Sequence, residues 1–279
     1  QSGALRCWGG NSHGQLGTGD TSGGYGYPDS SSNVSLPVNY GVKHVVTREY
    51  FTAVVLENGQ AYIWGYSRSW TQLGVGYSCD YFIWSNGCDG SQNLLTPTQI
   101  PLPAGTLANG IYSVENGYES HSCIVLTDGN AACWGRNANG ELGIGTTGTA
   151  GTPSLVYLPN GITSDIVTMA LSGDQNTHST CALWANGSIY CWGYNGYGQL
   201  GDGTNCPDNN YENNCNGYQA KPIIYDPVVL PSGTFAIALW SSTSNGQFCS
   251  LLSSGGIWCW GNGINESNGT GEYPNIFST

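Results

Sequence analysis

One motif occurs five times in this chain, and it constrains the fold more than any other feature. The fullest copy runs from Cys191 to Gly203 and reads Cys-Trp-Gly-Tyr-Asn-Gly-Tyr-Gly-Gln-Leu-Gly-Asp-Gly. The copies begin at residues 7, 63, 133, 191 and 259, and their tryptophans are 56, 70, 58 and 68 residues apart. A period of this size, filled with short strand-like runs and glycine turns, predicts a radial or stacked array of β units that bury little core alone.

Three pairs of cysteines, each ten residues apart, straddle predicted hairpin turns. In one ribbon the loop 127–129 ends in a glycine, which can close two antiparallel strands and places Cys123 directly opposite Cys133. Directly opposed Cβ atoms lie about 4.5 to 5.5 Å apart, within reach of a disulfide. We therefore predict three cross-strand disulfides: Cys123–Cys133, Cys181–Cys191 and Cys249–Cys259. The second repeat has the same ribbon with Ala53 and Ile63 in place of the cysteines.

Two further cysteine pairs, each nine residues apart, lie in polar insertions at residues 77–93 and 204–219. Both insertions follow the glycine that ends a motif, so we expect them to be equivalent surface loops, and their spacing does not fit zinc ligands. Five disulfides in one chain indicate an oxidising, extracellular compartment. The pairs predicted here are Cys79–Cys88 and Cys206–Cys215, which leaves Cys7 unpaired or paired between molecules.

Composition excludes several classes of partner. The chain has 279 residues, a net charge of -12 and six scattered basic residues, so no basic stripe is available for a nucleic acid or an anionic membrane. The apolar run at residues 235–240 is far shorter than the roughly 20 residues that a spanning helix needs, and we expect no membrane insertion. An amino-terminal Gln1 fits a mature secreted product.

Each repeat presents its segments in one order, with a Pro-led edge strand, an inner strand and then the ribbon. In the third repeat these are Thr96-Pro97, Ile111–Val114 and His121–Leu126. Together with Cys-Trp-Gly and Gly-Gln-Leu-Gly-x-Gly, this order resembles the repeat of the regulator of chromosome condensation family over almost the whole chain. The resemblance implies an all-β fold, a β-propeller of four-stranded blades around a central channel. We expect a single domain, residues 1–279, with about five blades, four complete and one partial, in an incompletely closed ring.

The family resemblance does not by itself transfer a function. The founding member of the family exchanges nucleotide on a nuclear GTPase and binds chromatin, roles that suit a reducing compartment and basic docking surfaces. This chain is acidic and is predicted to contain disulfides. Secreted relatives include a bacterial β-lactamase inhibitor protein that binds through loops on one propeller face, which keeps protein binding open.

The repeated aromatic and histidine residues have structural interpretations. A tryptophan at one position of every unit favours packing between blades over a role as a sugar-stacking platform. His121 and His178 precede a ribbon cysteine and favour a structural hydrogen bond, whereas His13 and His44 have no recognisable partner motif. We therefore expect no enzyme activity, no cofactor and no metal. A calcium site in the second insertion would lack the spacing of an EF-hand; its candidate ligands are Asp202, Asp208 and Glu212.

Four Asn-x-Ser/Thr sequons are candidate glycosylation sites. Asn33 lies in a predicted polar loop, and Asn186 lies at a tight hairpin tip. Asn268 takes the place of a motif leucine in the last unit, as terminal repeats often do. The four candidates are Asn33, Asn186, Asn265 and Asn268, and the leucines that Asn268 replaces are Leu16, Leu73, Leu142 and Leu200.

Two functions fit these features. The first is an extracellular, non-enzymatic structural or adhesive building block that self-associates, as in a head-to-tail filament. The second is a secreted monomeric binding module, an inhibitor or a lectin, that binds another extracellular protein or a glycan through loops 20–36, 77–93 and 204–219. For the first we expect the segments Ser2–Trp8 and Tyr273–Phe277 to contact neighbouring subunits, with contacts from Leu5, Cys7, Tyr273, Ile276 and Phe277.

Overall fold

The fold is described from a computed structural model of the chain. The residues that it describes are 5–22, 32–37, 39–66, 73–76, 93–116, 119–158, 165–173, 177–206, 220–221, 226–242 and 246–262. These residues form an all-β structure without a helix, as predicted. In this part of the chain no helix is long and apolar enough to cross a membrane.

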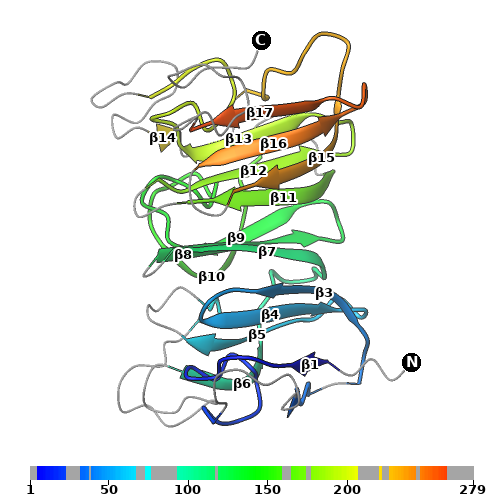
Figure 1. Ribbon diagram of the computed structural model, residues 1–279, viewed down its shortest axis with the longest axis vertical. Coiled ribbons are helices and arrows are strands. Elements are labelled where there is room, and N and C mark those ends of the chain that lie inside the picture. Colours follow the sequence, from blue (N-terminus) through cyan, green and yellow to red (C-terminus); the bar gives the residue numbers. More distant parts are fainter. Residues whose placement is uncertain are drawn as a thin grey trace.

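Antiparallel sheets of similar build follow one another along the chain (Figure 1). Blade 1 contains β3 (Val42–Thr47), β4 (Phe51–Leu56), β5 (Ala61–Tyr66) and β6 (Asn93–Gln99). Blade 2 contains β7 (Ala108–Asn116), β8 (Glu119–Leu126), β9 (Ala131–Gly135) and β10 (Ala150–Leu155). Blade 3 contains β11 (Ile166–Ser172), β12 (Ser179–Trp184), β13 (Ile189–Tyr194) and β14 (Ala220–Lys221). Blade 4 contains β15 (Ala236–Ser241), β16 (Gln247–Leu252) and β17 (Ile257–Gly261), and a half-blade contains β1 (Arg6–Cys7) and β2 (Ser32–Asn33).

The blades are out of phase with the sequence repeat by one strand. The Pro-led strand that opens a repeat pairs with the blade before it, so β6, which contains Pro97, completes blade 1 rather than blade 2. Proline has no N–H to donate, and the outer edge of a sheet is the place that tolerates this loss. The predicted order of segments is therefore confirmed, but each blade takes its outer strand from the next repeat. The next Pro-led segment of the sequence, residues 273–277, lies outside the described residues.

Within the described residues the sheets form an open array rather than a closed ring. Successive inner strands contact one another, from β3 to β7, β11 and β15. The half-blade and blade 4 lie at opposite ends of the long axis (Figure 1). The expectation of about five units with incomplete closure is thus confirmed, although blade 4 shows three strands in the part of the chain that is described.

The hairpin register agrees with the sequence prediction. Residues Cys123 and Cys133 are paired across β8 and β9, and the three ribbon disulfides have Cα–Cα distances of 4.1, 4.0 and 4.1 Å. In blade 1 the same position holds Ala53 opposite Ile63, both fully buried. Cys206 is disulfide-bonded, and its predicted partner Cys215 lies outside the described residues, as do Cys79 and Cys88. The three ribbon disulfides fit an oxidising environment.

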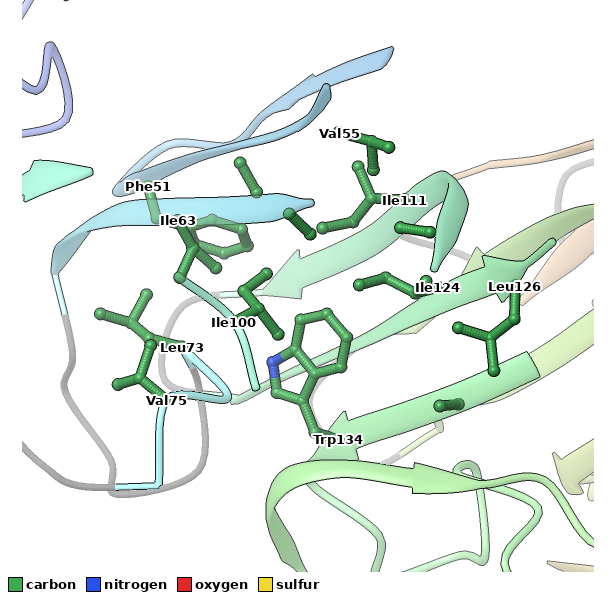
Figure 2. Close-up of a cluster of buried hydrophobic side chains, with 14 of the residues drawn as sticks. Phe51, Val55, Ile63, Leu73, Val75, Ile100, Ile111, Ile124, Leu126 and Trp134 are labelled. Atoms are coloured by element: carbon green, nitrogen blue, oxygen red, sulfur yellow. The ribbon is translucent and has the colours of Figure 1, made fainter. Parts of the chain in front are cut away.

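The hydrophobic core lies between blades rather than within them. Between blades 1 and 2, Phe51 and Ile63 face Ile111, Ile124 and Trp134 (Figure 2). A second cluster joins blade 2 to blade 3, and a third joins blade 3 to blade 4. A single unit therefore has little core of its own, as the length of the repeat indicates.

A double substitution tests the ribbon disulfides. Replacing Cys123→Ala and Cys133→Ile copies the buried pair of blade 1. Closing a loop of this length is worth about 3 kcal/mol in the chain-entropy model, so the variant should fold but unfold at lower denaturant concentration by up to that amount. Peptide mapping without reduction should also recover the three cross-strand pairs. Finding Cys123 joined to Cys181 would contradict the hairpin register.

Candidate functional site

The blades are joined by one repeated contact, which involves the motif tryptophan. In three of the four buried motif tryptophans, the indole Nε1 donates a hydrogen bond to a backbone carbonyl oxygen of the preceding unit. This bond runs from Trp64 to Gln15 at 2.9 Å, from Trp192 to Glu141 at 2.9 Å and from Trp260 to Gln199 at 3.0 Å. The acceptors lie in loops 11–19, 137–145 and 195–203, which we call socket loops.

The tryptophan ring approaches the motif glycine so closely that no side chain fits at this position. A Cβ atom at Gly143 would lie 2.6 Å from the Trp192 Nε1 atom, and one at Gly17 would lie 2.7 Å from the Trp64 Nε1 atom. Real Cβ contacts essentially never fall below 3.0 Å. The same conflict occurs between Gly74 and Trp134 and between Gly201 and Trp260. The Leu-Gly signature is therefore a binding surface for the next blade.

A buried asparagine shapes each socket loop. The Asn137 Oδ1 atom accepts a hydrogen bond from the Leu142 N–H at 2.9 Å, and its Nδ2 donates to the carbonyls of Thr146 and Gly148, both at 2.8 Å. Asn11 and Asn195 make the matching bonds to Leu16 and Leu200, and all three asparagines are fully buried. Sequence reasoning missed these residues, although the signal was present as Trp-Gly-x-Asn in three of the five motifs.

Trp8 departs from this pattern. It is 63% exposed, whereas the other four motif tryptophans are at most 2% exposed, so the prediction that all five pack between blades is wrong for Trp8. The reason is that no preceding unit among the described residues offers it a socket loop. Beside it, a hollow of about 470 Å³ lies between β1 and the inner strands of blade 1, lined by residues that include Leu5, Arg6, Val45 and Arg48.

Cys7 occupies the register position that carries a disulfide in three other units. It is a free thiol, partly buried, and burial raises its pKa. It pairs with Ser32 of β2, and among the described residues no strand lies on its other edge, where β8 supplies the partner of Cys133. Within the described residues, the thiol of Cys7 therefore faces the edge of β1 that carries no neighbouring strand.

Blade 4, at the opposite end of the array, also exposes a side chain that is buried in another blade. Ile257 of β17 is 70% exposed, whereas Ile189 at the same position of blade 3 is fully buried. In blade 3 the Ile189 carbonyl accepts a hydrogen bond from the Val228 N–H at 2.8 Å. The edge of blade 4 therefore leaves an apolar side chain uncovered.

The structure brings His121 and His178 together from different blades, which the sequence did not indicate. Their Nδ1 atoms are 3.3 Å apart, and the His121 Nε2 lies 2.8 Å from the Thr180 hydroxyl. The Thr180 hydroxyl donates its proton to the Glu141 carbonyl at 2.8 Å, so His121 Nε2–H is the donor to Thr180. A neutral His121 then accepts from His178 through Nδ1.

Charged neighbours complete this buried cluster. The Arg136 guanidinium donates to the Glu141 carboxylate at 2.5 Å, and the Asn139 N–H donates to the other carboxylate oxygen at 2.7 Å. Burial raises the pKa of Glu141, and Arg136 opposes this shift. Burial, the neighbouring histidine and Arg136 hold the pKa of His121 well below its ordinary value, and burial and Arg136 lower the pKa of His178 to about 3. His121, His178 and Thr180 are all fully buried, so a substrate cannot reach the two histidines.

The remaining predicted residues are dispersed. His44 packs against Tyr112, and His13 packs against Tyr50 and Tyr66. The Asp202 carboxylate accepts hydrogen bonds from the Thr204 N–H and hydroxyl. Seven other predicted residues lie outside the described residues: Asp208, Glu212, Asn265, Asn268, Tyr273, Ile276 and Phe277.

The two described sequons differ in setting. Asn33 is exposed but lies in strand β2, not in a loop as expected, and its Oδ1 accepts a hydrogen bond from the Arg6 Nε at 3.2 Å. Asn186 is exposed at the hairpin tip, where its Oδ1 accepts from the Ser188 N–H at 2.9 Å. Both positions therefore remain candidates for a glycan.

Known proteins share these repeats. The family model described as regulator of chromosome condensation (RCC1) repeat matches residues 116–141 and 186–224. The ultraviolet-B receptor UVR8 of Arabidopsis thaliana is 30% identical over 205 residues, which are 72% of this chain and 40% of that protein. Protein RCC2 of Homo sapiens is 33% identical over 112 residues, 40% of this chain and 20% of that protein. This chain is an RCC1-like repeat protein.

Solved structures agree on the fold of this RCC1-like chain. Human WBSCR16 matches it with a TM-score of 0.68 at 18% identity, over 96% of this chain and 59% of that one. Prp20p from Saccharomyces cerevisiae matches with a TM-score of 0.52 at 16% identity, over 99% and 72%. The chain spans less than half the length of the curated relatives it matches. RCC1-like propellers are mostly binding or regulatory proteins.

A pair of glycine substitutions tests the socket. Gly143 and Gly145 both have positive φ, at 66° and 80°, but a Cβ at Gly145 would meet nothing within 4 Å. Gly143→Ala should therefore destabilise the fold by about 1 to 3 kcal/mol more than Gly145→Ala, because only Gly143 contacts Trp192. Chemical unfolding measures both. Equal losses would mean that backbone strain alone explains the motif.

The histidine pair predicts a pH dependence of stability. Both histidines are neutral in the fold and bind protons after unfolding at their ordinary value of about 6.5, so stability rises with pH between about 3 and 6.5 and falls on acidification. The slope is at most about 1.4 kcal/mol per pH unit for each histidine. Unfolding of the native chain and of His178→Gln from pH 7 to 4.5 should show a smaller slope in the variant. Identical slopes would contradict this assignment.

Proposed function

We propose that this RCC1-like chain is an extracellular, non-catalytic building block that self-associates head to tail. The observation that carries the proposal is the exposure of Trp8. Three junctions within the chain bury the equivalent tryptophan against a socket loop, and the half-blade presents the same residue to solvent at 63% exposure.

The last unit of a second copy would supply the socket that Trp8 lacks. Residues 263–271 stand at the positions of socket loop 195–203, with Ser267-Asn268-Gly269 in place of Gln199-Leu200-Gly201. Gly269 keeps the glycine that a tryptophan requires, and Asn268 replaces the motif leucine. A junction of this kind joins two different surfaces, so it propagates rather than closing as a dimer.

The other parts of the proposal rest on cysteine and histidine chemistry. The three ribbon disulfides support an extracellular location. The histidines of the described residues pack against tyrosine rings or lie buried, which supports a role without catalysis. The alternative is a secreted monomeric binding module, and the state of association separates the two.

Light scattering and negative-stain microscopy of the native chain test the proposal. The native protein should form assemblies, and Trp8→Ala should reduce them to monomers while leaving thermal stability nearly unchanged, because Trp8 is mostly exposed. The matched control is Trp240→Ala, which removes another half-exposed tryptophan, at 52%, from inner strand β15 and should still assemble. A native protein that stays monomeric would support the binding module instead.

A further inference from the structure

The hollow beside β1 lies where a neighbouring strand runs in the other blades. In blades 1 to 3 the third strand is paired on both sides, as β5 is with β4 and β6. Within the described chain β1 is paired with β2 alone, and β2 stands where β6 stands in blade 1, so the free edge of β1 is the one that β4 would occupy. An unpaired strand edge is a template for another strand.

We infer that this hollow receives residues 272–279 of a second copy as an added β-strand. This deepens the proposed self-association and rests on it. The added strand would pair with the open edge of β1, and its side chains would enter the hollow of about 470 Å³. Recognition of this type draws affinity from main-chain hydrogen bonds and specificity from pockets for alternate side chains.

The lining of the hollow selects an acidic, partly apolar segment. Two of the six basic residues of the chain, Arg6 and Arg48, line it with one acidic residue, Glu49, in a protein whose net charge is -12. Leu5, Leu16 and Val45 add apolar surface, with Val45 48% exposed. The Arg48 guanidinium donates to the Ser113 carbonyl of blade 2 and lies near Glu115, so Arg6 is the cation that the hollow offers beside its apolar surface.

The carboxyl-terminal segment has the complementary chemistry. Residues 272–279 read Glu-Tyr-Pro-Asn-Ile-Phe-Ser-Thr, which combines one carboxylate with three large apolar side chains and no basic residue. Tyrosine, isoleucine, phenylalanine and threonine are all strand formers. The opposite charges of Glu272 and Arg6 favour this segment over a neutral one.

A neighbouring copy is the better source of the segment. Strand β17, after which the segment follows in the chain, lies at the opposite end of the array from β1 (Figure 1). The exposed Ile257 also marks the end of blade 4 as an open edge. Insertion into the next copy would place the tail and the Trp8 contact at the same junction.

A mixing experiment with full-length variants tests this inference. Arg6→Glu should disable the hollow, and Ile276→Asp should disable the inserted strand, so each variant alone should be monomeric by light scattering. A mixture retains one intact hollow and one intact tail, and it should form heterodimers and nothing longer. The control Lys43→Glu reverses an exposed charge on β3 outside the hollow and should assemble like the native chain.

Outcomes of the mixing experiment separate the two proposals. Assembly that Trp8→Ala abolishes but Ile276→Asp leaves intact overturns the strand insertion and preserves the proposed function. A native chain that remains monomeric overturns both. A mixture of Arg6→Glu and Ile276→Asp that stays monomeric overturns the insertion.

Disulfide trapping provides a readout that does not depend on assembly size. Cys7 lies on β1 beside the open edge. Single substitutions Pro274→Cys, Asn275→Cys and Ile276→Cys, incubated with a small-molecule disulfide as oxidant, should give intermolecular links to Cys7. The oxidant is reduced to two thiols as the two cysteine thiols lose their protons and form the bond. Successive strand residues point to opposite faces, so neighbouring positions should link with different yields. No link from any position overturns the insertion.

Discussion

The fold depends on the contact between a tryptophan indole and the socket loop of the unit before it. Because the core lies between blades, each unit is stable only when its neighbour is correctly seated. Seating requires three features together: an indole N–H that reaches a carbonyl, a glycine that leaves room for the ring, and an asparagine that holds the loop in shape. The residues of the recurring sequence motif are the ones that form this contact between units.

Local features could be predicted from the sequence, and contacts between units could not. The register of β8 and β9 follows from a three-residue loop and a spacing of ten, and both lie within one hairpin. The assignment of the Pro-led strand to the preceding blade depends on pairing with β5, about 30 residues earlier, which no local pattern encodes. The exposure of Trp8 likewise depends on which units lie beside it, since no described unit precedes it and its Cys-Trp-Gly motif is that of the buried copies.

Small departures from the repeat make one junction chemically distinct. Glu141 stands where Gln15 and Gln199 stand, and each of these side chains accepts a hydrogen bond from a backbone N–H of its own loop. The carboxylate adds a charge that Arg136 neutralises, and His121 is linked to the Glu141 backbone carbonyl through the Thr180 hydroxyl. Because its two buried histidines would have to bind protons, the junction between blades 2 and 3 is the one at which acid should first loosen the array.

The overlap of repeat and blade has a mechanical consequence. Because each blade takes its outer strand from the following repeat, a pulling force on the chain cannot extend one repeat without also stripping a strand from the blade before it. The ribbon disulfides tie the second and third strands of blades 2, 3 and 4 and shorten the length that each can release. A force along the chain therefore acts on the strand-to-strand hydrogen bonds of neighbouring blades in series.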